Sequence, residues 1–237
     1  MCKLVQFRTL STGNRCCNSI TSFIPKHNPA HKDDIVKINN FITSSNKLLI
    51  LTGAGVSTES GIPDYRSEGV GLYARSTNRP VQYQEFVKKE NVRKRYWARN
   101  YVGWPRFSSF KPNLIHDIIC DLELKHEKVS CVVTQNVDRL HSKAGSRNVI
   151  ELHGSAFKVI CISCNNTIDR HVFQTVLEKL NPTMKSTTDM IRPDGDVDIP
   201  QVRIKLCSLQ RLCRIRNMQG LCLSTYVGIY NGVQRES

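Results

Sequence analysis

Three clusters of polar and glycine residues directly follow short apolar runs in this chain. They are Gly53-Ala54-Gly55, Gln135-Asn136-Val137-Asp138 and His153-Gly154-Ser155. Short apolar runs of this kind predict buried strands, and the carboxyl ends of parallel strands meet at one edge of an α/β sheet. We therefore expect the three clusters to converge on one crevice.

The glycines of the first cluster have two explanations. Without side chains at Gly53 and Gly55, backbone N–H groups there can approach a phosphate closely. However, the segment GAGVS is not a complete G-x-G-x-x-G fingerprint, and a tight strand-to-helix turn without a ligand explains the glycines equally well. A Rossmann dehydrogenase is excluded, because no full fingerprint is followed by an acidic residue about 20 positions later.

The other candidate side chains also have structural alternatives. A histidine before a glycine is more often a hydrogen-bonded structural residue, but the position of His153 at a strand end beside two other polar clusters favours a functional role. Asp138 and Arg139 could be a helix N-terminal pair in a solvated loop. Arg66 could simply balance the charge of Asp64.

The segment CISC supplies two thiols, Cys161 and Cys164, at the spacing of half a structural zinc site. Tetrahedral zinc needs four ligands, and none of the later cysteines, Cys207, Cys213 and Cys222, forms a second Cys-x-x-Cys pair. We therefore expect an incomplete zinc site. A thioredoxin-like redox motif is disfavoured, because the pair does not open a helix after a strand.

Apolar spacing predicts alternating helices and short strands. We expect strands at 47–52, 129–134 and 149–152, an amphipathic helix at 33–45 and a charged, aromatic helix at 81–101. A further helix begins near Pro112, with an apolar face made of Leu114, Ile115, Ile118, Ile119 and Leu122. This alternation predicts an α/β fold with a parallel sheet.

Charge and composition exclude several classes of protein. The net charge of +14 is concentrated at the two ends of the chain, and the nearly balanced middle shows no basic stripe with interleaved aromatic residues, which argues against nucleic-acid binding. No apolar run reaches the ~18 residues needed to span a membrane. The ten cysteines are scattered in a way that suits a reducing compartment better than a disulfide framework.

The first 32 residues have the composition of a mitochondrial transit peptide. They contain five basic residues, no acidic residue and many Ser and Thr. An ordinary N-terminal tail is the alternative. We exclude this segment from the fold and expect the mature protein in the mitochondrial matrix.

The motifs GAGVSTESGIPDYRS, TQNVDRLH, ELHG and CISC, in this order, resemble the sirtuin family of NAD-dependent protein deacylases. The segment GIPDYRSEGVGLYARSTNRP resembles the mitochondrial class II branch of that family, and the resemblance covers about residues 33–200. It implies a Rossmann-like sheet, NAD and zinc as cofactors, and acylated lysine side chains of mitochondrial proteins as substrates. The reaction releases nicotinamide, by deacylation or by ADP-ribosyl transfer.

The resemblance also implies roles for individual residues. His153 would be the general base, with Asn136 and Asp138 also at the reaction centre, and Cys161 and Cys164 would bind zinc. The cofactor-binding residues would be Gly53, Ala54, Gly55, Ser57, Glu59, Asp64, Tyr65, Arg66, Gln135, Asn136, Val137 and Asp138.

Two residues of the segment RYWARNYVGW are candidates for contact with the acyl group. Tyr96 and Arg99 are three residues apart and therefore share a helix face. The simpler explanation is a core aromatic residue beside a solvated arginine. The sharper one is that Arg99 pairs with a carboxylate on the acyl chain.

The resemblance ends near residue 201. The second zinc pair and the later strands of the sheet, with their contacts to the adenosine half of NAD, are not found in the remaining segment. We expect four parts: a transit peptide at 1–32, a Rossmann-like NAD-binding core lacking its second half at 33–157, the start of a zinc-ribbon insert at 158–200, and a divergent, poorly ordered tail at 201–237. These departures leave an alternative to the deacylase, a catalytically impaired or inactive form that acts at most as a binding protein.

Overall fold

The computed structural model describes residues 23–75, 81–161, 165–184 and 226–228. The helices in these ranges are α1 (Lys32–Ser44), α2 (Leu72–Arg75), α3 (Tyr83–Lys88), α4 (Glu90–Ser109), α5 (Leu114–Leu124), α6 (Leu140–Ala144) and α7 (Arg170–Leu180), with a 3-10 helix, η1, at Ala54–Ser60. The strands are β1 (Leu48–Thr52), β2 (Val129–Thr134), β3 (Val149–Glu151), β4 (Lys158–Cys161), β5 (Thr167–Asp169) and β6 (Tyr226–Gly228).

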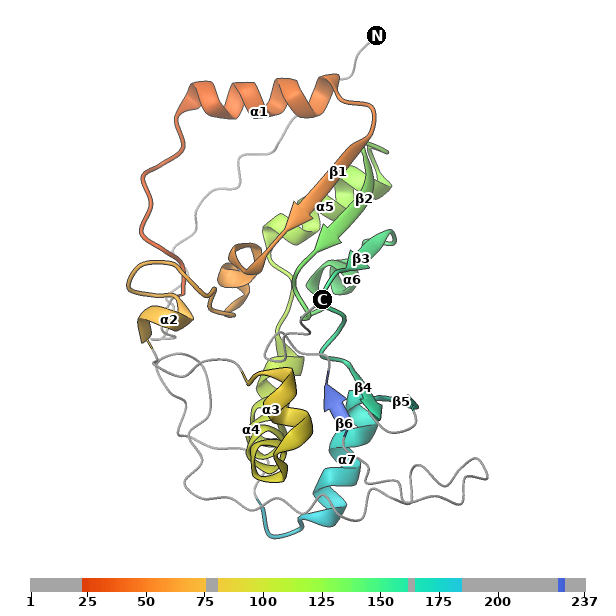
Figure 1. Ribbon diagram of the computed structural model, residues 1–237. Coiled ribbons are helices and arrows are strands. Elements are labelled where there is room, and N and C mark those ends of the chain that lie inside the picture. The colour runs from red at the N-terminus through yellow and green to blue at the C-terminus, as the bar shows by residue number, and fades with distance from the viewer. Residues whose placement is uncertain (1–22, 76–80, 162–164, 185–225, 229–237) are drawn as a thin grey trace.

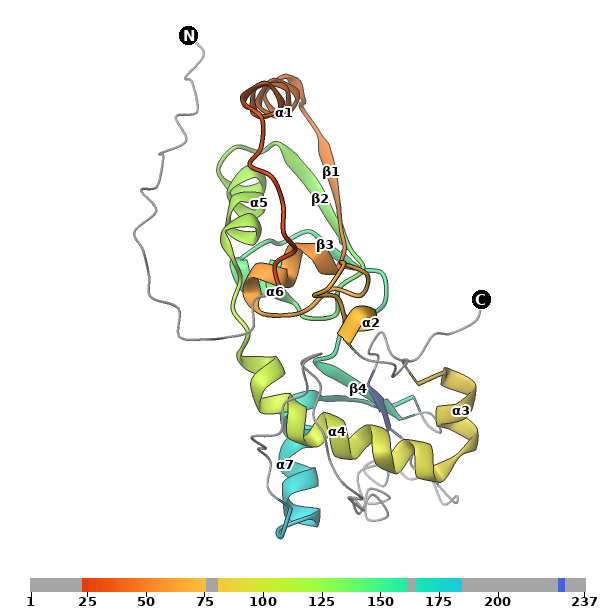
Figure 2. The same ribbon diagram turned by 90° about the vertical axis from the view of Figure 1, so that its left-hand side faces the viewer.

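The first three strands form the predicted parallel sheet. Its order is β1-β2-β3, and β2 pairs in parallel with both neighbours. Figures 1 and 2 show this sheet with α1, α5 and α6 at one end of the molecule. The predicted α/β fold and the three predicted strands are confirmed.

Only one face of the parallel sheet is covered by the residues that the structure describes. On that face Ile119 and Leu122 of α5 pack against Val129 and Val132 of β2, with partly buried side chains of β1 and β3 around them. On the other face the side chains are exposed, by 67% for Leu49 and 51% for Ile150. The prediction that 47–52 is a buried strand is therefore wrong for Leu49 and Leu51.

Two helices differ from the prediction in how they use their apolar residues. α1 forms where an amphipathic helix is predicted, but Ile35, Ile38 and Phe41 remain exposed, and only Ile42 packs against the cluster under the sheet. α5 begins just after Pro112 because Asn113 caps it, accepting hydrogen bonds from the backbone amides of Ile115 and His116. The first two apolar residues of α5 stay exposed, whereas Ile118, Ile119 and Leu122 face the core.

A second body lies at the opposite end of the molecule. It contains the antiparallel sheet β5-β4-β6 together with α3, α4 and α7 (Figures 1 and 2). The predicted single helix over 81–101 is instead two, because the chain becomes extended at Lys89, and α4 continues to Ser109. Of the predicted divergent tail, residues 226–228 are described, and they form β6.

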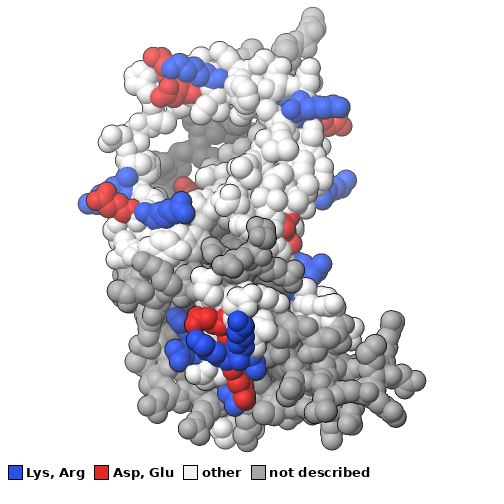
Figure 3. All heavy atoms as spheres, viewed as in Figure 1, with Lys and Arg blue, Asp and Glu red and all other residues white. Residues whose placement is uncertain are grey.

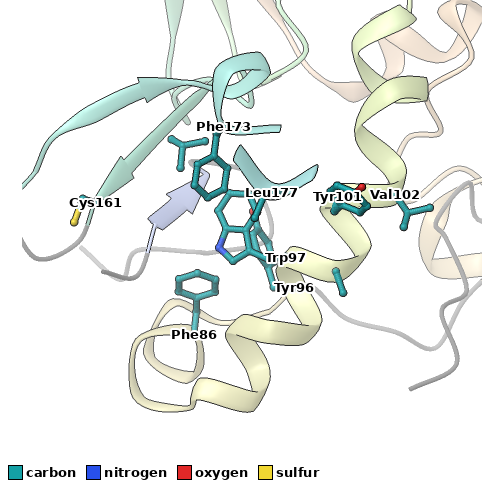
Figure 4. Close-up of a cluster of buried hydrophobic side chains, with 10 residues drawn as sticks. Phe86, Tyr96, Trp97, Tyr101, Val102, Cys161, Phe173 and Leu177 are labelled. Atoms are coloured by element: carbon teal, nitrogen blue, oxygen red, sulfur yellow. The ribbon is translucent and has the colours of Figure 1, made fainter. Parts of the chain in front are cut away.

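The core of the second body joins segments from both sides of the expected boundary at residue 157. Figure 4 shows Phe86 of α3 and Trp97 of α4 beside Phe173 and Leu177 of α7. The Trp97 and Phe173 rings lie 4.7 Å apart between centroids. The helices of 83–109 therefore pack with the residues after 157 rather than against the parallel sheet.

Charged side chains on the face shown in Figure 3 lie in groups of both signs over α1 and over α3 and α4. On α1 the charged atoms of Lys37 and Asp34 are 3.2 Å apart, and at the end of α3 those of Lys89 and Glu85 are 3.0 Å apart. Exposed pairs at this spacing contribute only about 0.3–0.5 kcal/mol each to their own helix. Among the residues that the structure describes, no helix combines the length and the apolar composition needed to cross a membrane.

Proline inside α4 creates a polar contact between α4 and α7. Pro105 has no N–H, so the carbonyl of Tyr101 loses its usual partner one turn later in the helix. The Gln174 side chain of α7 donates to that carbonyl at 3.0 Å. Gln174 also accepts at 2.8 Å from the guanidinium of Arg170, which is buried between the rings of Trp97 and Trp104.

We predict that Gln174→Met lowers the free energy of unfolding by about 1–3 kcal/mol, since it leaves a buried carbonyl and a buried guanidinium without this partner. The loss should be smaller in a Pro105→Ala background, because an alanine at that position supplies an N–H to the Tyr101 carbonyl. Urea unfolding of the two single variants and the double variant measures this coupling. The exposed neighbour Thr175→Ala should change little, and strictly additive losses would contradict the assignment.

Candidate functional site

The carboxyl ends of the three parallel strands meet as predicted. Thr52 and Thr134, the last residues of β1 and β2, are partners in the sheet register. The next residues continue the pairing, because the Gln135 amide donates to the Thr52 carbonyl at 3.0 Å and the Leu152 amide donates to the Thr134 carbonyl at 2.9 Å. The polar clusters after β1, β2 and β3 therefore share one edge of the sheet.

Gly53 and Gly55 stand where the chain leaves β1 and enters η1. Gly53 has an extended backbone, with φ −133°, and neither glycine lies in the left-handed region. A Cβ atom added to either residue would meet no protein atom within 4 Å. Neither backbone conformation nor internal packing requires glycine here, which leaves room for a ligand beside the backbone as the reason for it.

Hydrogen bonds from its own amide nitrogen hold the Asn136 side chain in place. Both hydrogens of its Nδ2 are donated inside the protein, to the Gly53 carbonyl at 3.0 Å and to Ser57 Oγ at 3.2 Å. The side chain is buried, with 7% of the residue exposed. The Oδ1 oxygen is therefore the part of this carboxamide that can accept a hydrogen bond from a ligand.

Asp138 is likewise buried and engaged on both oxygens. Its Oδ2 accepts from Ser57 Oγ at 2.8 Å, and its Oδ1 accepts at 2.9 Å from the backbone amide of Leu140, the first residue of α6. The contact with Leu140 agrees with the alternative of a helix N-terminal residue, although the loop is buried rather than solvated, and the role of Asp138 at the reaction centre stays a prediction. Asp138 and Ser57 position η1 against the loop after β2.

His153 is exposed, in contrast to these two residues. Its Nδ1 lies 2.9 Å from the backbone carbonyl of Gln135. A carbonyl oxygen only accepts hydrogen bonds, so Nδ1 carries the hydrogen and the neutral ring presents an unprotonated Nε2. This geometry gives the ring the lone pair that a general base needs.

Val137, between Asn136 and Asp138, faces away from this edge. Its side chain packs with Trp104 of α4 and with Ala156 and Phe157, which precede β4. Lys143 of α6 strengthens the same junction by donating to the carbonyls of Ser108 and Phe110, at 3.0 and 2.9 Å. Val137 therefore joins the two bodies, and its contact with the cofactor stays a prediction.

Four further predicted residues lie on η1 or in the segment after it. Asp64 accepts from the backbone amide of Ser67 at 3.0 Å and from its hydroxyl, which closes a local turn rather than an Asp64–Arg66 ion pair. Tyr65 stacks at a tilt on Tyr73, with centroids 5.7 Å apart. Arg66 and Glu59 are exposed, and Glu59 lies on η1.

Tyr96 lies in the aromatic core of the second body. Its ring makes edge contacts with Phe86 and Trp97, with centroids 5.1 and 5.5 Å away (Figure 4). Burial raises the pKa of its hydroxyl far above the usual value for tyrosine. The explanation of Tyr96 as a core aromatic residue fits this placement, and Arg99 is half-buried on the same helix.

The described residues do not assemble a zinc site. Cys161 is buried at the end of β4, while Cys164 and the later cysteines lie outside the described residues. Within the described ranges, no three His, Cys, Asp or Glu side chains are placed to hold a metal ion. The structure therefore shows one of the two predicted thiols and no completed ligand set.

Three residues at this edge were not predicted from the sequence. The hydroxyls of Thr52 and Thr134 lie 2.8 Å apart, and His141 Nε2 lies 3.0 Å from Thr52 Oγ1. Thr134 Oγ1 in turn accepts from the backbone amide of Asn136 at 3.1 Å. The available signal was a threonine ending each of two apolar runs, at positions that pair in a parallel sheet.

Comparison with known proteins gives consistent results. The model of the Sir2 family matches residues 53–196. The chain is 58% identical over 198 residues to "NAD-dependent protein deacylase Sirt4" of Drosophila melanogaster, a match that covers 84% of this chain and 62% of that protein. It is 48% identical over 187 residues to the human "NAD-dependent protein lipoamidase sirtuin-4, mitochondrial". That match covers 79% of this chain and 59% of the human protein. The chain thus spans about three fifths of the length of these curated relatives.

Two solved structures share the fold. A solved structure described as "Structural Basis for the Mechanism and Regulation of Sir2 Enzymes" aligns with a TM-score of 0.52 and 33% identity, over 63% of this chain and 57% of that one. "Sir2-p53 peptide-NAD+" aligns with a TM-score of 0.51 and 30% identity, over 62% and 55%. None of these matches supports the alternative of an inactive form. Because the family model matches more than half of the sequence and the fold agrees, the chain belongs to the Sir2 family.

Proposed function

We propose that this protein is an NAD-dependent protein-lysine deacylase that releases nicotinamide, with ADP-ribosyl transfer as the related reaction of the same site. One observation carries the proposal: at the ends of three parallel strands, the Asn136 carboxamide donates to the Gly53 carbonyl, and the His153 imidazole donates to the carbonyl of the residue just before Asn136. The relatives named as deacylase and lipoamidase support the same chemistry.

The residues at the end of β1 fit the pyrophosphate of NAD. A ligand can approach the backbone of Gly53 and Gly55 because a Cβ atom at either position would point into open space. Backbone N–H groups at the start of a helical turn are good partners for anions. Asp64, Tyr65 and Arg66 would lie beside the nicotinamide ribose.

NAD, when bound at this edge, would supply an electrophilic ribose carbon for the acyl-lysine oxygen, with nicotinamide as the leaving group. Asn136 Oδ1 accepts a hydrogen bond from the carboxamide or hydroxyl of the bound cofactor, because both hydrogens of its Nδ2 are already used inside the protein. His153 Nε2 takes a proton from a ribose hydroxyl. The Gln135 carbonyl keeps the hydrogen of the ring on Nδ1 throughout that step.

The substrates are acylated lysine side chains of proteins, and we propose that they include mitochondrial proteins. The acid-free, basic N-terminal segment and the relatives named as mitochondrial support that location. Residues 1–32 fused to a fluorescent protein should carry it into mitochondria. A diffuse cytosolic signal would contradict the proposed location.

We predict that His153→Ala lowers acyl-lysine-dependent nicotinamide release by about 10²–10⁴-fold, because it removes the general base. The assay uses the purified protein with NAD and a panel of acetyl-, lipoyl- and carboxyacyl-lysine peptides. The exposed His126→Ala is the matched control and should keep the rate. No nicotinamide release by the unaltered protein on any peptide would refute the proposed function, and equal rates for His153→Ala would refute the role of that residue.

We also predict that Gly55→Ala separates cofactor binding from stability. The added Cβ meets no protein atom, so the melting temperature should stay the same or rise slightly, whereas the Kd for NAD should increase by about tenfold or more. Gly71→Ala is the contrasting variant, because its Cβ would come within 2.6 Å of the Ser67 backbone nitrogen. Gly71→Ala should lose stability. Unchanged NAD affinity in a folded Gly55→Ala protein would show that the cofactor does not approach this backbone.

A further inference from the structure

His141 begins a chain of buried hydrogen bonds that ends at the candidate site. The His141 side chain on α6 is buried, with 2% of the residue exposed, and its Nε2 lies 3.0 Å from Thr52 Oγ1 on β1. Thr52 Oγ1 donates to Thr134 Oγ1 on β2 at 2.8 Å. Thr134 Oγ1 accepts from the backbone amide of Asn136 at 3.1 Å.

The bond from Thr52 to Thr134 sets the direction of the bond with His141. Thr52 has one hydroxyl hydrogen and gives it to Thr134, so it can only accept from His141. His141 Nε2 therefore carries the ring hydrogen. Thr134 Oγ1 then accepts two hydrogen bonds, one from Thr52 and one from the Asn136 amide. Successive hydrogen bonds in such a chain strengthen one another.

The same histidine is costly to bury. With its hydrogen on Nε2, its Nδ1 is a bare acceptor, and that atom has no hydrogen-bond partner among the described residues. The ring packs on the buried ring of His116, with centroids 4.8 Å apart. Burial, together with His116, lowers the pKa of His141 to about 4, although the carboxylates of Asp138 and Glu123 act in the opposite direction.

An apolar side chain would fill this space without an unpaired nitrogen. An unsatisfied buried acceptor typically costs about 1–3 kcal/mol. The contact that a histidine makes here and an apolar residue could not make is the donation to Thr52. Packing alone therefore does not account for the residue, whereas control of the threonine pair does.

We propose that His141 is a positioning residue for the cofactor site, which it serves by holding the Thr52–Thr134 pair so that the backbone of Asn136 is fixed where β2 ends. The expected effect on NAD binding rests on the proposed function, whereas the hold of His141 on the Asn136 backbone does not. Asn136 then offers Oδ1 to the ligand at a set place, because both its amide hydrogens and its backbone are already anchored.

The test compares two substitutions of His141. His141→Gln keeps an N–H donor near the position of Nε2, whereas His141→Leu keeps only bulk. For each purified variant we would measure the Kd for NAD and, by NMR, the hydrogen-exchange rate of the Asn136 backbone amide. The exposed His126→Gln is the control and should leave both values unchanged.

We expect His141→Leu to weaken NAD binding and to speed exchange at Asn136, each by about tenfold or more, and His141→Gln to restore both to within about threefold. A purely structural role would lower the melting temperature of both variants without this rescue. The inference is overturned if His141→Leu leaves both values within about twofold, or if His141→Gln is as impaired as His141→Leu.

Two further results have defined meanings. If the unaltered protein does not bind NAD, the proposed function fails, and the exchange rate at Asn136 alone decides the positioning role. If His141→Leu does not fold, Thr52→Val breaks the chain at its next member, with Thr52→Ser as the variant that keeps the hydroxyl. Thr52→Val must then speed exchange at Asn136, and an unchanged rate overturns the inference.

Discussion

The register of β1 against β2 is the constraint on which the candidate site depends. Because Thr52 pairs with Thr134, both strands end at the same level, and their hydroxyls meet in a buried hydrogen bond. A shift of one residue would turn each side chain to the opposite face of the sheet. Gly53 and Asn136 would then no longer leave the sheet together, and the bond from the Asn136 side chain to the Gly53 carbonyl could not form.

Beyond the strand ends, the loop after β2 takes up a backbone conformation that few residues adopt readily. Arg139 lies in the left-handed region, with φ 58°, although it has a side chain. The neighbouring Asp138 accepts from the backbone amide of Leu140, the first residue of α6. The Arg139 guanidinium lies 3.7 Å from the Glu151 carboxylate on β3. Burial raises the pKa of the Glu151 carboxyl, and Arg139 opposes that rise. The ion pair thus helps to hold the loop that carries Asn136 against the strand that leads to His153.

The sequence predicted the local structure of the site better than its surroundings. Apolar runs located β1, β2 and β3, and polar residues at their ends predicted the convergence, because both signals are local in the chain. Periodicity could not show which face of the sheet would be covered, and Leu49 is exposed where burial was expected. Nor could it show that Phe86 packs with Phe173, or that Gln174 satisfies the carbonyl freed by Pro105, since these contacts join distant segments.

The candidate site residues divide by burial into two kinds. Ser57, Asn136 and Asp138 are buried, and most of their hydrogen-bonding capacity is used inside the protein. His153 is exposed, and one ring nitrogen stays available for a proton. Groups that are fixed before a ligand arrives need little reorganisation when charge develops, which is the condition for electrostatic stabilisation. As the proposed base, the exposed His153 would meet a solvent-borne substrate at a place that the buried residues around it have already set. The Val137 contact with Trp104 and Phe157 anchors that geometry to the second body.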